Sequence, residues 1–342
     1  MQAAGVRTIV DARSLSVAGI VEVVAHIPRI YGEFRKLVRA AASEKPDVAV
    51  LTDSPDFHLR LAKKLKKQGV PVIYLIAPQV WAWRPWRARA MKRDLRRLLC
   101  IFPFEKSFFD RFKVPVTYIG HPLARIVRPS TSASEFRTRF QIPEKPIITL
   151  LPGSRRGEGE RHMPFLIDAV ARIGAGYHYI LALPPGFDAK QTKFWERIQG
   201  SSIQVIEGCT WDALAHAELA LAASGTVTME AAMLGTPMVT FYRVNALSWI
   251  LGRWLVRAPF LSMVNLVAGR RVVPELIQQE MTAERIAREA ELLLQDSPAR
   301  EAMRDGLREV AASLATERDP MEIAAEWIEK VSSESKEIVH AR

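Results

Sequence analysis

The sequence predicts an α/β protein with two Rossmann-like domains, each built on a parallel sheet, and a helical carboxyl-terminal tail. Short apolar runs of strand length alternate with helical patterns in both halves of the 342-residue chain. A polar stretch from Arg128 to Lys145, rich in proline and serine, interrupts that alternation once. Strands that alternate with helices build doubly wound parallel sheets, and a chain of this length suits two ordinary domains. We therefore expect one sheet on each side of this stretch.

The first half shows four apolar runs that predict buried strands. These runs are Pro46 to Thr52, Val72 to Ile76, Leu98 to Phe102 and Val116 to Ile119. The clearest helical pattern between them runs from Leu59 to Gln68 and is closed by Gly69. Residues 1–16 show neither the strand nor the glycine-rich turn with which a doubly wound domain ordinarily opens. We therefore expect either a variant first half or an incomplete amino terminus.

The second half predicts a further parallel sheet that is followed by helices. Its strand-like runs are Ile147 to Leu151, Tyr179 to Leu183, Ile203 to Ile206, Leu219 to Ala222 and Met238 to Phe241. Helical patterns dominate after Thr282, with helix starts at Ser297-Pro298 and Asp319-Pro320. The expected domains are residues 1–144, residues 145–318, and a helix with its tail at residues 319–342. Ligands of such domains bind at the carboxyl ends of the strands, in the cleft between the halves.

The composition narrows the classes of partner. Lysine and arginine outnumber aspartate and glutamate by 48 to 37, which gives a formal net charge of +11. A basic surface is typical of proteins that bind nucleic acid, anionic membrane or phosphorylated small molecules, and it also serves solubility alone. The cysteines, Cys100 and Cys209, form neither a disulfide framework nor a metal-binding spacing, which fits a reducing cytoplasm. No signal peptide and no run of 18 uncharged apolar residues is visible, so no segment is expected to span a membrane.

The stretch from Leu219 to Val239 is the most informative one. An apolar run ends in Ser224-Gly225-Thr226, and an amphipathic helical segment follows. Backbone N–H groups at the start of such a helix, together with the helix dipole, favour an anion. Glu230 lies about one turn beyond Thr226 and is therefore near the same site. A phosphate cradle with a carboxylate beside it suits a nucleotide, with the ribose hydroxyls on the acid.

A second loop of this kind follows the run from Ile147 to Leu151. It contains Gly153, Ser154 and Arg155, and the arginine is suited to neutralise a diphosphate whose charge grows as it leaves. A solvated turn is the alternative for either loop alone. The pair favours a functional site, because two such loops can converge at adjacent strand ends. No cluster of histidine, cysteine and acidic residues has metal-ligand spacing, so we expect neither a metal nor another cofactor.

Asp53 directly follows the first apolar run, where a carboxylate points into the cleft. It is a candidate general base that takes a proton from an attacking hydroxyl. The alternative is that Asp53 or, by its spacing, Asp56 caps the helix that begins near Leu59. His121 and Asn265 are weaker candidates, for the cleft and for a phosphate respectively, and either residue is also explained by a turn.

Trp81, Trp83 and Arg84 follow the second run and lead into a basic cluster that extends to Arg97. This combination suits nucleic-acid stacking, a membrane interface or the wall over a phosphorylated acceptor, and also a solvated helix with core tryptophans. Apolar faces edged with arginine also occur at 17–40 and 247–264, and they suit peripheral membrane contact as well as core packing. The membrane-contact candidates are Ile20, Val23, Val24, Ile27, Ile30 and Tyr31.

Seven motifs, in this order, closely resemble lipid-A-disaccharide synthase over nearly the whole chain. They are Asp53 to Phe57, Pro78 to Arg84, Phe102 to Lys106, Tyr118 to His121, Leu150 to Arg155, Ala223 to Thr226 with Glu230, and Asn265 to Gly269. The resemblance implies a GT-B fold, with two Rossmann-like domains around a central cleft. It also implies an inverting glycosyl transfer that uses no metal.

The implied reaction condenses UDP-2,3-diacylglucosamine with the 6-hydroxyl of 2,3-diacylglucosamine 1-phosphate (lipid X). Its products are the lipid A disaccharide 1-phosphate and UDP, on the route to lipopolysaccharide. The resemblance further implies a cytoplasmic enzyme that is peripheral on the inner face of the Gram-negative inner membrane. The carboxyl-terminal helices, near Pro320 to Ser333, are implied to pack back on the first domain or on a partner chain, which leaves a homodimer open.

Matched residue by residue, the resemblance implies that Asp53 is the base and that Arg155 contacts the phosphates of the donor. Ser224, Gly225, Thr226 and Glu230 match the nucleotide site, and Asn265 matches a functionally important asparagine. Val17 to Tyr31 matches an exposed apolar region of the first domain of the family.

The chain differs from the family at its start. The family opens with a strand and a Gly-Glu-x-Ser-Gly-Asp loop, and this sequence shows neither of them before its first matching residues. We expect a misassigned start or a fragment, and we hypothesise that an upstream extension raises activity.

Three other interpretations stay open. The first is a GT-B enzyme acting on another UDP-sugar, such as a peptidoglycan glycosyltransferase or an epimerase. The second is a nucleic-acid-binding protein that uses the cluster from Arg84 to Arg97, and its binding would weaken with salt. It leaves both strand-end loops unexplained, so we expect no nucleic-acid partner. The third is an inactive, membrane-associated remnant.

Overall fold

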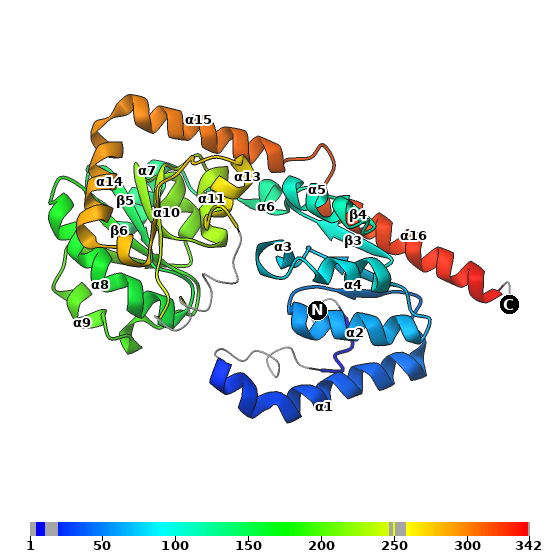
Figure 1. Ribbon diagram of the computed structural model, residues 1–342. Helices are drawn as coiled ribbons and strands as arrows, with labels where there is room; N and C mark the ends of the chain where they lie inside the picture. Colours follow the sequence, from blue (N-terminus) through cyan, green and yellow to red (C-terminus); the bar gives the residue numbers. More distant parts are fainter. Residues whose placement is uncertain (1–4, 11–19, 246–248, 250–257, 341–342) are drawn as a thin grey trace. The chain divides into compact units, whose positions relative to one another are not determined.

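The structure is a computed structural model that describes residues 5–10, 20–245, 249 and 258–340, with the side chains of residues 20–26 and 338–340 left out. The chain divides into two compact units. Unit 1 comprises Met1–Gly120 and Thr316–Arg342, and unit 2 comprises His121–Ala315. Each unit contains a parallel sheet with helices, which confirms the predicted fold class. Figure 1 labels many of these elements and colours the chain from blue at its amino terminus to red at its carboxyl terminus.

Unit 1 is built on a four-stranded parallel sheet with the order β1-β2-β3-β4. The strands are β1 (Ala49–Leu51), β2 (Val72–Leu75), β3 (Arg97–Cys100) and β4 (Val116–Tyr118). The helices are α1 (Ile20–Glu44), α2 (Pro55–Lys67), α3 (Val80–Trp83), α4 (Arg87–Asp94), α5 (Pro103–Arg111) and α16 (Pro320–His340). All four strands overlap the runs predicted from the sequence. Their carboxyl ends lie at one edge of the sheet because neighbouring strands are parallel.

Helix α2 shows why these residues form and hold this unit. Pro55 occupies the first turn, where its missing N–H costs no hydrogen bond, and lysines fill the last turn, where they complement the helix dipole. Leu61 and Leu65 are buried in the core on one face. Helix α1 lies alongside α2 (Figure 1). Between these helices the ring of Phe34 meets that of Phe57 edge to face, with 5.5 Å between the ring centroids.

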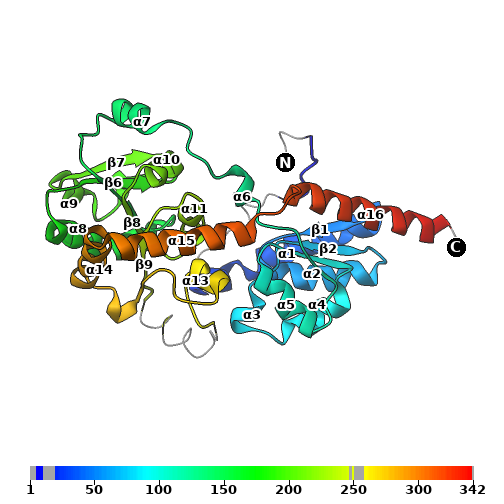
Figure 2. The ribbon, with the colours of Figure 1, turned by 90° about the horizontal axis from the view of Figure 1, so that it is seen from above.

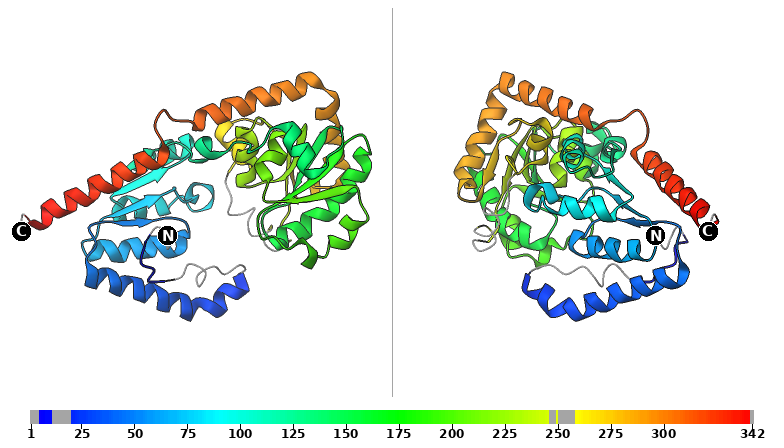
Figure 3. Two further views of the ribbon diagram at one scale, coloured as in Figure 1. Left: turned by 180° about the vertical axis from the view of Figure 1, so that it is seen from behind. Right: turned by 45° about the vertical axis from the view of Figure 1, so that its right-hand side comes forward.

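The carboxyl-terminal helix α16 belongs to unit 1. The Arg97 guanidinium lies 3.8 Å from the centroid of the Trp327 ring, and Ala324 and Val331 are buried. Arg96 forms a 2.6 Å ion pair with Glu334, but exposed pairs of this kind stabilise weakly, so the packing dominates the attachment. The helix therefore lies beside β3 of its own chain (Figure 3).

Unit 2 is built on a six-stranded parallel sheet with the order β10-β9-β8-β5-β6-β7. The strands are β5 (Ile147–Leu151), β6 (His178–Leu183), β7 (Ile203–Glu207), β8 (Leu219–Ala223), β9 (Met238–Tyr242) and β10 (Glu275–Ile277). This is the Rossmann order, in which the chain reverses direction across the sheet between its first and fourth strands. Those strands are β5 and β8, which are hydrogen-bonded neighbours. Crevices that bind ligands form at the carboxyl ends of such a pair.

The helices of unit 2 cover both faces of this sheet. Every residue of β5 and β8 is buried, and successive strand residues point to opposite faces, so neither face is open there. Figure 2 shows these helices around the sheet. They are α6 (Leu123–Ile126), α7 (Ala133–Phe140), α8 (Arg156–Ile173), α9 (Trp195–Gln199), α10 (Thr210–Ala215), α11 (Thr226–Met233), α13 (Met263–Ala268), α14 (Ala283–Gln295) and α15 (Ser297–Leu314).

The boundary between the units lies at Gly120, earlier than the predicted boundary at residue 144. The polar stretch that reads as a linker is in fact held by unit 2. The Asp212 carboxylate accepts hydrogen bonds from the backbone and hydroxyl groups of Ser130 and Thr131, at 2.7 to 2.9 Å. Burial alone would raise the pKa of Asp212, but these bonds outweigh it and hold the pKa below its usual range. Phe136 of α7 is also buried, which fixes the segment.

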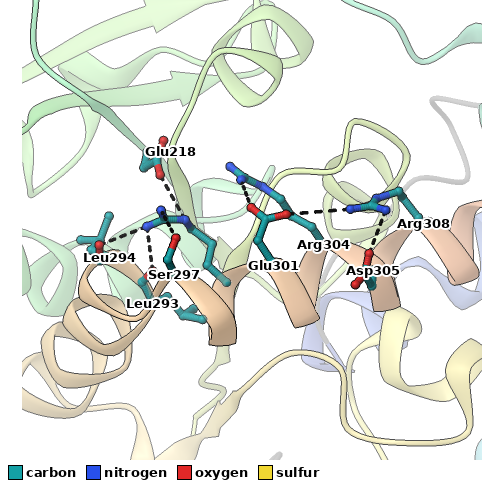
Figure 4. Close-up of polar contacts among 9 residues, drawn as sticks. Glu218, Leu293, Leu294, Ser297, Glu301, Arg304, Asp305 and Arg308 are labelled. Atoms are coloured by element: carbon teal, nitrogen blue, oxygen red, sulfur yellow. Dashed lines mark hydrogen bonds and ion pairs between the residues drawn. The ribbon is translucent and has the colours of Figure 1, made fainter.

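A joint between α14 and α15 anchors the start of β8. Arg300 donates hydrogen bonds to the carbonyls of Leu293 and Leu294, at 3.1 and 3.0 Å, and so caps the end of α14 (Figure 4). The same guanidinium forms a 3.2 Å ion pair with Glu218, the residue before β8. The strand that carries the Ser224 loop is therefore fixed at its opposite end.

Candidate functional site

A pocket of about 360 Å³ lies at the carboxyl ends of β5 and β8 in unit 2. The loop after β5 contributes Gly153, Ser154 and Arg155, and the loop after β8 contributes Ser224, Gly225 and Thr226. Glu230 of α11 also lines it. The structure therefore brings together the two loops whose convergence the sequence left as an expectation. The remaining lining residues are Leu151, Glu158, Ala182, Pro184, Thr210, Ala223 and Val227.

The amino-terminal end of α11 gives this pocket an electrostatic preference. Thr226 begins the helix and, with Val227, lines the pocket, so the positive end of the helix dipole faces the cavity. Ser224 is fixed beside it, because its N–H donates to the Phe241 carbonyl at 2.8 Å and its hydroxyl to the Leu261 carbonyl at 3.2 Å. This wall of the pocket suits an anion.

Arg155 lies on the loop after β5, and its side chain makes only a weak contact with the rest of the described chain. Its side chain is 80% exposed, and its contact with Glu158 is a long 3.9 Å. An exposed pair at that distance is weak, so a bound anion competes easily for the guanidinium. Gly153 is required two residues earlier, because its φ is +115° and a Cβ there would lie 2.6 Å from Glu158 Oε2. The loop brings its backbone and its arginine close to the cavity.

Glu230 is oriented by a tryptophan that sequence reasoning missed. The Trp211 indole N–H donates to Glu230 Oε2 at 3.0 Å. Burial raises the pKa of this carboxyl, although the indole bond acts against the shift. A partly buried acceptor beside an anion site is the arrangement that binds the hydroxyls of a ribose.

Asp53 lies in unit 1, directly after β1. Its side chain is exposed, and among the residues that the structure describes its carboxylate has no hydrogen-bond or ion-pair partner. Capping does not explain it. Helix α2 begins at Pro55, before the predicted start at Leu59, and its cap residue Ser54 makes no side-chain hydrogen bond to it. Asp56 lies inside the helix, so its predicted capping role is wrong.

Asp56 instead pairs with the basic cluster that follows β2. Its carboxylate accepts from Arg84 at 3.1 Å and from Arg87. Partial burial acts to raise the pKa of Asp56, but the Arg87 hydrogen bond and the nearby arginine charges hold it below the usual range. The Arg84 guanidinium also lies 4.0 Å from the centroid of the Trp83 ring. Part of the predicted basic surface is therefore neutralised internally.

Trp81 contacts a second carboxylate, that of Glu105, which the sequence analysis did not single out. Its indole N–H donates to Glu105 Oε1 at 3.1 Å, and its ring meets that of Phe104 edge to face at 4.9 Å. Glu105 is buried at the start of α5, where it also accepts from the Phe102 N–H at 3.3 Å. Burial raises the pKa of Glu105 to about 8. The Phe102 to Lys106 motif contains this glutamate, but only the fold shows what it contacts.

Two weaker candidates are not among the residues that line the pocket. His121 is buried, and desolvation lowers its pKa to about 4, so the neutral ring accepts from the Leu123 N–H at Nδ1. Asn265 is fully buried, and its amide bonds to the backbone of Val272 and Val273 and to Glu275. Both side chains organise their own loops in the structure.

The predicted membrane surface is described only in part. Ile27 and Tyr31 on α1 are 53% and 60% exposed, and Ile30 is half-buried. The side chains of Ile20, Val23 and Val24 lie outside the described residues, as does most of 247–264. No helix among the described residues has the length and apolarity needed to cross a bilayer. In the same part of the chain, no group of three or more histidine, cysteine or acidic residues is arranged to hold a metal ion.

Solved structures with a similar fold include a complex with UDP and a glycosyltransferase. The structure of S. aureus MnaA with UDP has a TM-score of 0.61 at 13% identity, covering 90% of this chain and 81% of that one. The calicheamicin glycosyltransferase CalG4 has a TM-score of 0.54 at 17% identity, with coverages of 92% and 82%. At these identities the likeness shows the fold alone, which is GT-B.

The sequence comparisons go further. A lipid-A-disaccharide synthase of Solibacter usitatus is 60% identical over 316 residues, which is 92% of this chain and 83% of that protein. A lipid-A-disaccharide synthase of Koribacter versatilis is 44% identical over 324 residues, which is 93% of this chain and 84% of that protein. A family model described as lipid-A-disaccharide synthetase matches residues 1–327. With the two strand-end loops and the GT-B fold already in place, these matches show that the chain belongs to the lipid-A-disaccharide synthase family.

Proposed function

We propose that this chain transfers 2,3-diacylglucosamine from its UDP derivative to the 6-hydroxyl of 2,3-diacylglucosamine 1-phosphate. The products are the lipid A disaccharide 1-phosphate and UDP. One observation supports the proposal most strongly: the two glycine-containing loops converge at the ends of β5 and β8. Doubly wound sheets bind nucleotides at this position, and the family membership names the sugar chemistry.

The donor half of the site is assigned to unit 2. The diphosphate lies against the amino-terminal end of α11 and the Ser224 loop, and Arg155 contacts it from the other side. Glu230, fixed by Trp211, accepts from the ribose hydroxyls. Negative charge on the diphosphate increases as the glycosidic bond breaks, so the arginine and the helix dipole stabilise the transition state more than the ground state.

The acceptor half is assigned to unit 1. Asp53 takes the proton of the 6-hydroxyl while that oxygen bonds to the anomeric carbon of the donor sugar. The bond from that carbon to the diphosphate oxygen breaks, and both electrons leave with UDP. Because the hydroxyl attacks the face opposite the leaving group, the anomeric configuration inverts. Trp83 and Arg84, whose side chains stack at 4.0 Å, form the surface proposed for the phosphorylated acceptor.

Membrane association is a separate part of the proposal. Both substrates carry acyl chains, and α1 presents the exposed Ile27 and Tyr31 among arginines and lysines. Helices of this composition lie in the interface of anionic membranes. Together with the family membership, this leads us to propose that the enzyme works at the cytoplasmic face of the inner membrane. Flotation with anionic vesicles tests this: Ile27→Asp with Tyr31→Asp should lower the bound fraction, and equal binding by both forms would contradict it.

The reaction is tested with purified protein, radiolabelled UDP-diacylglucosamine and lipid X in detergent. We expect a tetra-acylated disaccharide 1-phosphate and one UDP per disaccharide. Arg155→Ala should lower kcat/KM by about 100-fold, the usual loss when one donor to a developing anion is removed. Arg172→Ala is the matched control, because this arginine lies in the last turn of α8 and outside the lining of the pocket. Release of an epimerised UDP-sugar without disaccharide would contradict the proposal.

A further inference from the structure

The turn after β1 has an unusual backbone. Asp53 and Ser54 both have left-handed conformations, with φ of 57° and 40°, although neither residue is glycine. Such conformations crowd Cβ against the backbone, so other residues adopt them rarely and as single residues. Pro55 adds to the strain at Ser54, because a residue before proline is shifted towards extended conformations. A strained pair of this kind persists only where its surroundings over-determine it.

Two side chains from different elements supply that restraint. The backbone carbonyl of Asp53 accepts a hydrogen bond from the Tyr74 hydroxyl at 2.5 Å and one from His58 Nδ1 at 2.9 Å. These two donors use both lone pairs of the oxygen. The backbone N–H of His58 also donates to the Ser54 carbonyl at 2.9 Å, so both strained residues are held from the first turn of α2.

Tyr74 is the more rigid of the two donors. It lies on β2 directly opposite Leu51 of β1 in the parallel register, and its ring is fully buried. Burial, reinforced by the charge of Asp53, raises the pKa of Tyr74, so the hydroxyl keeps its proton and remains a donor. The neighbouring strand thus fixes the end of β1 through one oxygen atom.

This arrangement orients the Asp53 carboxylate without touching it. The peptide plane is set by the two donors and φ by the turn, so the direction of the Cα–Cβ bond follows and only two side-chain torsions remain. Among the described residues the carboxylate itself has no hydrogen-bond partner. Donors placed on the carboxylate would stabilise its charged form and weaken it as a base. Donors placed on the carbonyl give the orientation without that loss.

We propose that Tyr74 and His58 are positioning residues for Asp53, which act by holding the left-handed turn through its shared carbonyl. The proposal rests on the proposed function, in which Asp53 is the base. It assigns the two residues no contact with substrate. Their effect is therefore expected in kcat rather than in the KM of either substrate.

The first experiment removes one hydroxyl. Tyr74→Phe keeps the buried ring, and kcat should fall about tenfold while both KM values stay within about twofold, because small displacements of a reacting group cost up to about 100-fold. The matched control is Tyr179→Phe, since this buried tyrosine of unit 2 also donates to a backbone carbonyl, that of Gly174, at 2.7 Å. The control should keep its kcat. Unchanged kcat in Tyr74→Phe, or equal losses in both variants, would overturn the proposal.

A double-mutant cycle shows whether Tyr74 acts through Asp53. In an Asp53→Asn background, Tyr74→Phe should change the residual activity by less than about twofold, because the group that it positions is already disabled. A full additional tenfold loss would refute positioning while leaving Asp53 as the base. A normal kcat for Asp53→Asn would instead refute the base, and the positioning proposal with it.

His58 is tested by loss and rescue. His58→Ala removes the donor to the Asp53 carbonyl and should lower kcat several-fold, whereas His58→Asn places an amide N–H near the position of Nδ1 and should restore most of it. Circular dichroism and the melting temperature show that each variant is folded. Equal activity of the alanine and asparagine variants would overturn the role of His58.

Discussion

The loop after β5 in unit 2 contains a glycine, Gly153, with φ of +115°, whereas the loop after β1 in unit 1 contains an aspartate and a serine with φ of 57° and 40°. Both turns hold candidate functional groups at the carboxyl end of a parallel strand. Gly153 adopts its conformation without steric cost, because the pocket needs only its backbone there. In the proposed mechanism Asp53 acts through its side chain, so glycine is excluded and the strain is held by Tyr74 and His58. A site that uses a side chain therefore needs supporting donors that a site built from backbone does not.

The two units also share one kind of hydrogen bond. In each, a tryptophan indole N–H donates to a glutamate, Trp211 to Glu230 at 3.0 Å and Trp81 to Glu105 at 3.1 Å. Glu230 lines a pocket, whereas Glu105 is buried in the first turn of α5. The same kind of pair thus lies at the candidate ligand site in unit 2 and inside the fold in unit 1.

The largest expected effect separates the two half-sites. Asp53→Asn should lower kcat by about 10²- to 10⁴-fold, the usual contribution of a general base, because the amide cannot take the proton. UDP affinity, measured by calorimetry, should stay within about twofold, since the pocket belongs to unit 2. A parallel loss of UDP binding would show that the half-sites are not separable in this way.

The glycine turn is tested by adding one methyl group. Gly153→Ala should destabilise the protein by about 2–4 kcal/mol. The alanine would be strained in a backbone conformation with positive φ, and its Cβ would also clash with Glu158. Gly174→Ala is the matched control: its φ is +92°, but nothing lies within 4 Å of the added Cβ, so it reports strain alone. Urea denaturation measures both. Equal free energies of unfolding for the two variants would contradict the role of close approach.

The raised pKa of Glu105 leads us to expect that the stability of the protein falls as the pH rises. Burial raises its pKa in the folded state to about 8, above the ordinary value of 4.5, so the folded protein binds the proton more tightly than the unfolded chain. Its contribution is complete below about pH 4.5 and is lost as the pH rises to about 8. Glu105→Gln cannot titrate and should flatten the fall of the unfolding free energy across this window. An unchanged slope would contradict the prediction.

The smallest expected effect is a gain. Ser54→Gly relieves a left-handed residue and should raise the free energy of unfolding by up to about 1 kcal/mol, because the relief of strain exceeds the entropy lost by glycine. The same change should lower kcat about two- to threefold by loosening the turn beside Asp53. Chemical denaturation and steady-state kinetics report the two effects. Higher stability with unchanged kcat would show that the strain at Ser54 serves no positioning.

Local pattern allowed much of the fold to be predicted. The strand at Ile147–Leu151 was predicted with its observed bounds, because a run of five residues, of which all but Thr149 are apolar, lies between turn signals. The strand at Glu275–Ile277 was not predicted, because three residues that include a glutamate carry too little signal. The segment at 128–145 was interpreted as a linker because its polar residues resemble those of an exposed loop, although the hydroxyls of Ser130 and Thr131 donate hydrogen bonds to Asp212.

By itself, the sequence determined the two α/β units, the strand-end loops and Asp53, since these depend on local periodicity and on residue types at strand ends. Its resemblance to one family determined the expected chemistry. Only the tertiary structure decided which loops meet, because strand order is set by long-range packing: β5 and β8 are neighbours although 67 residues separate Leu151 from Leu219. It likewise decided that Asn265 is fully committed to its own loop and that Tyr74 reaches the Asp53 carbonyl. Hydrogen bonds between residues distant in sequence have no local signature, so no pattern reading finds them.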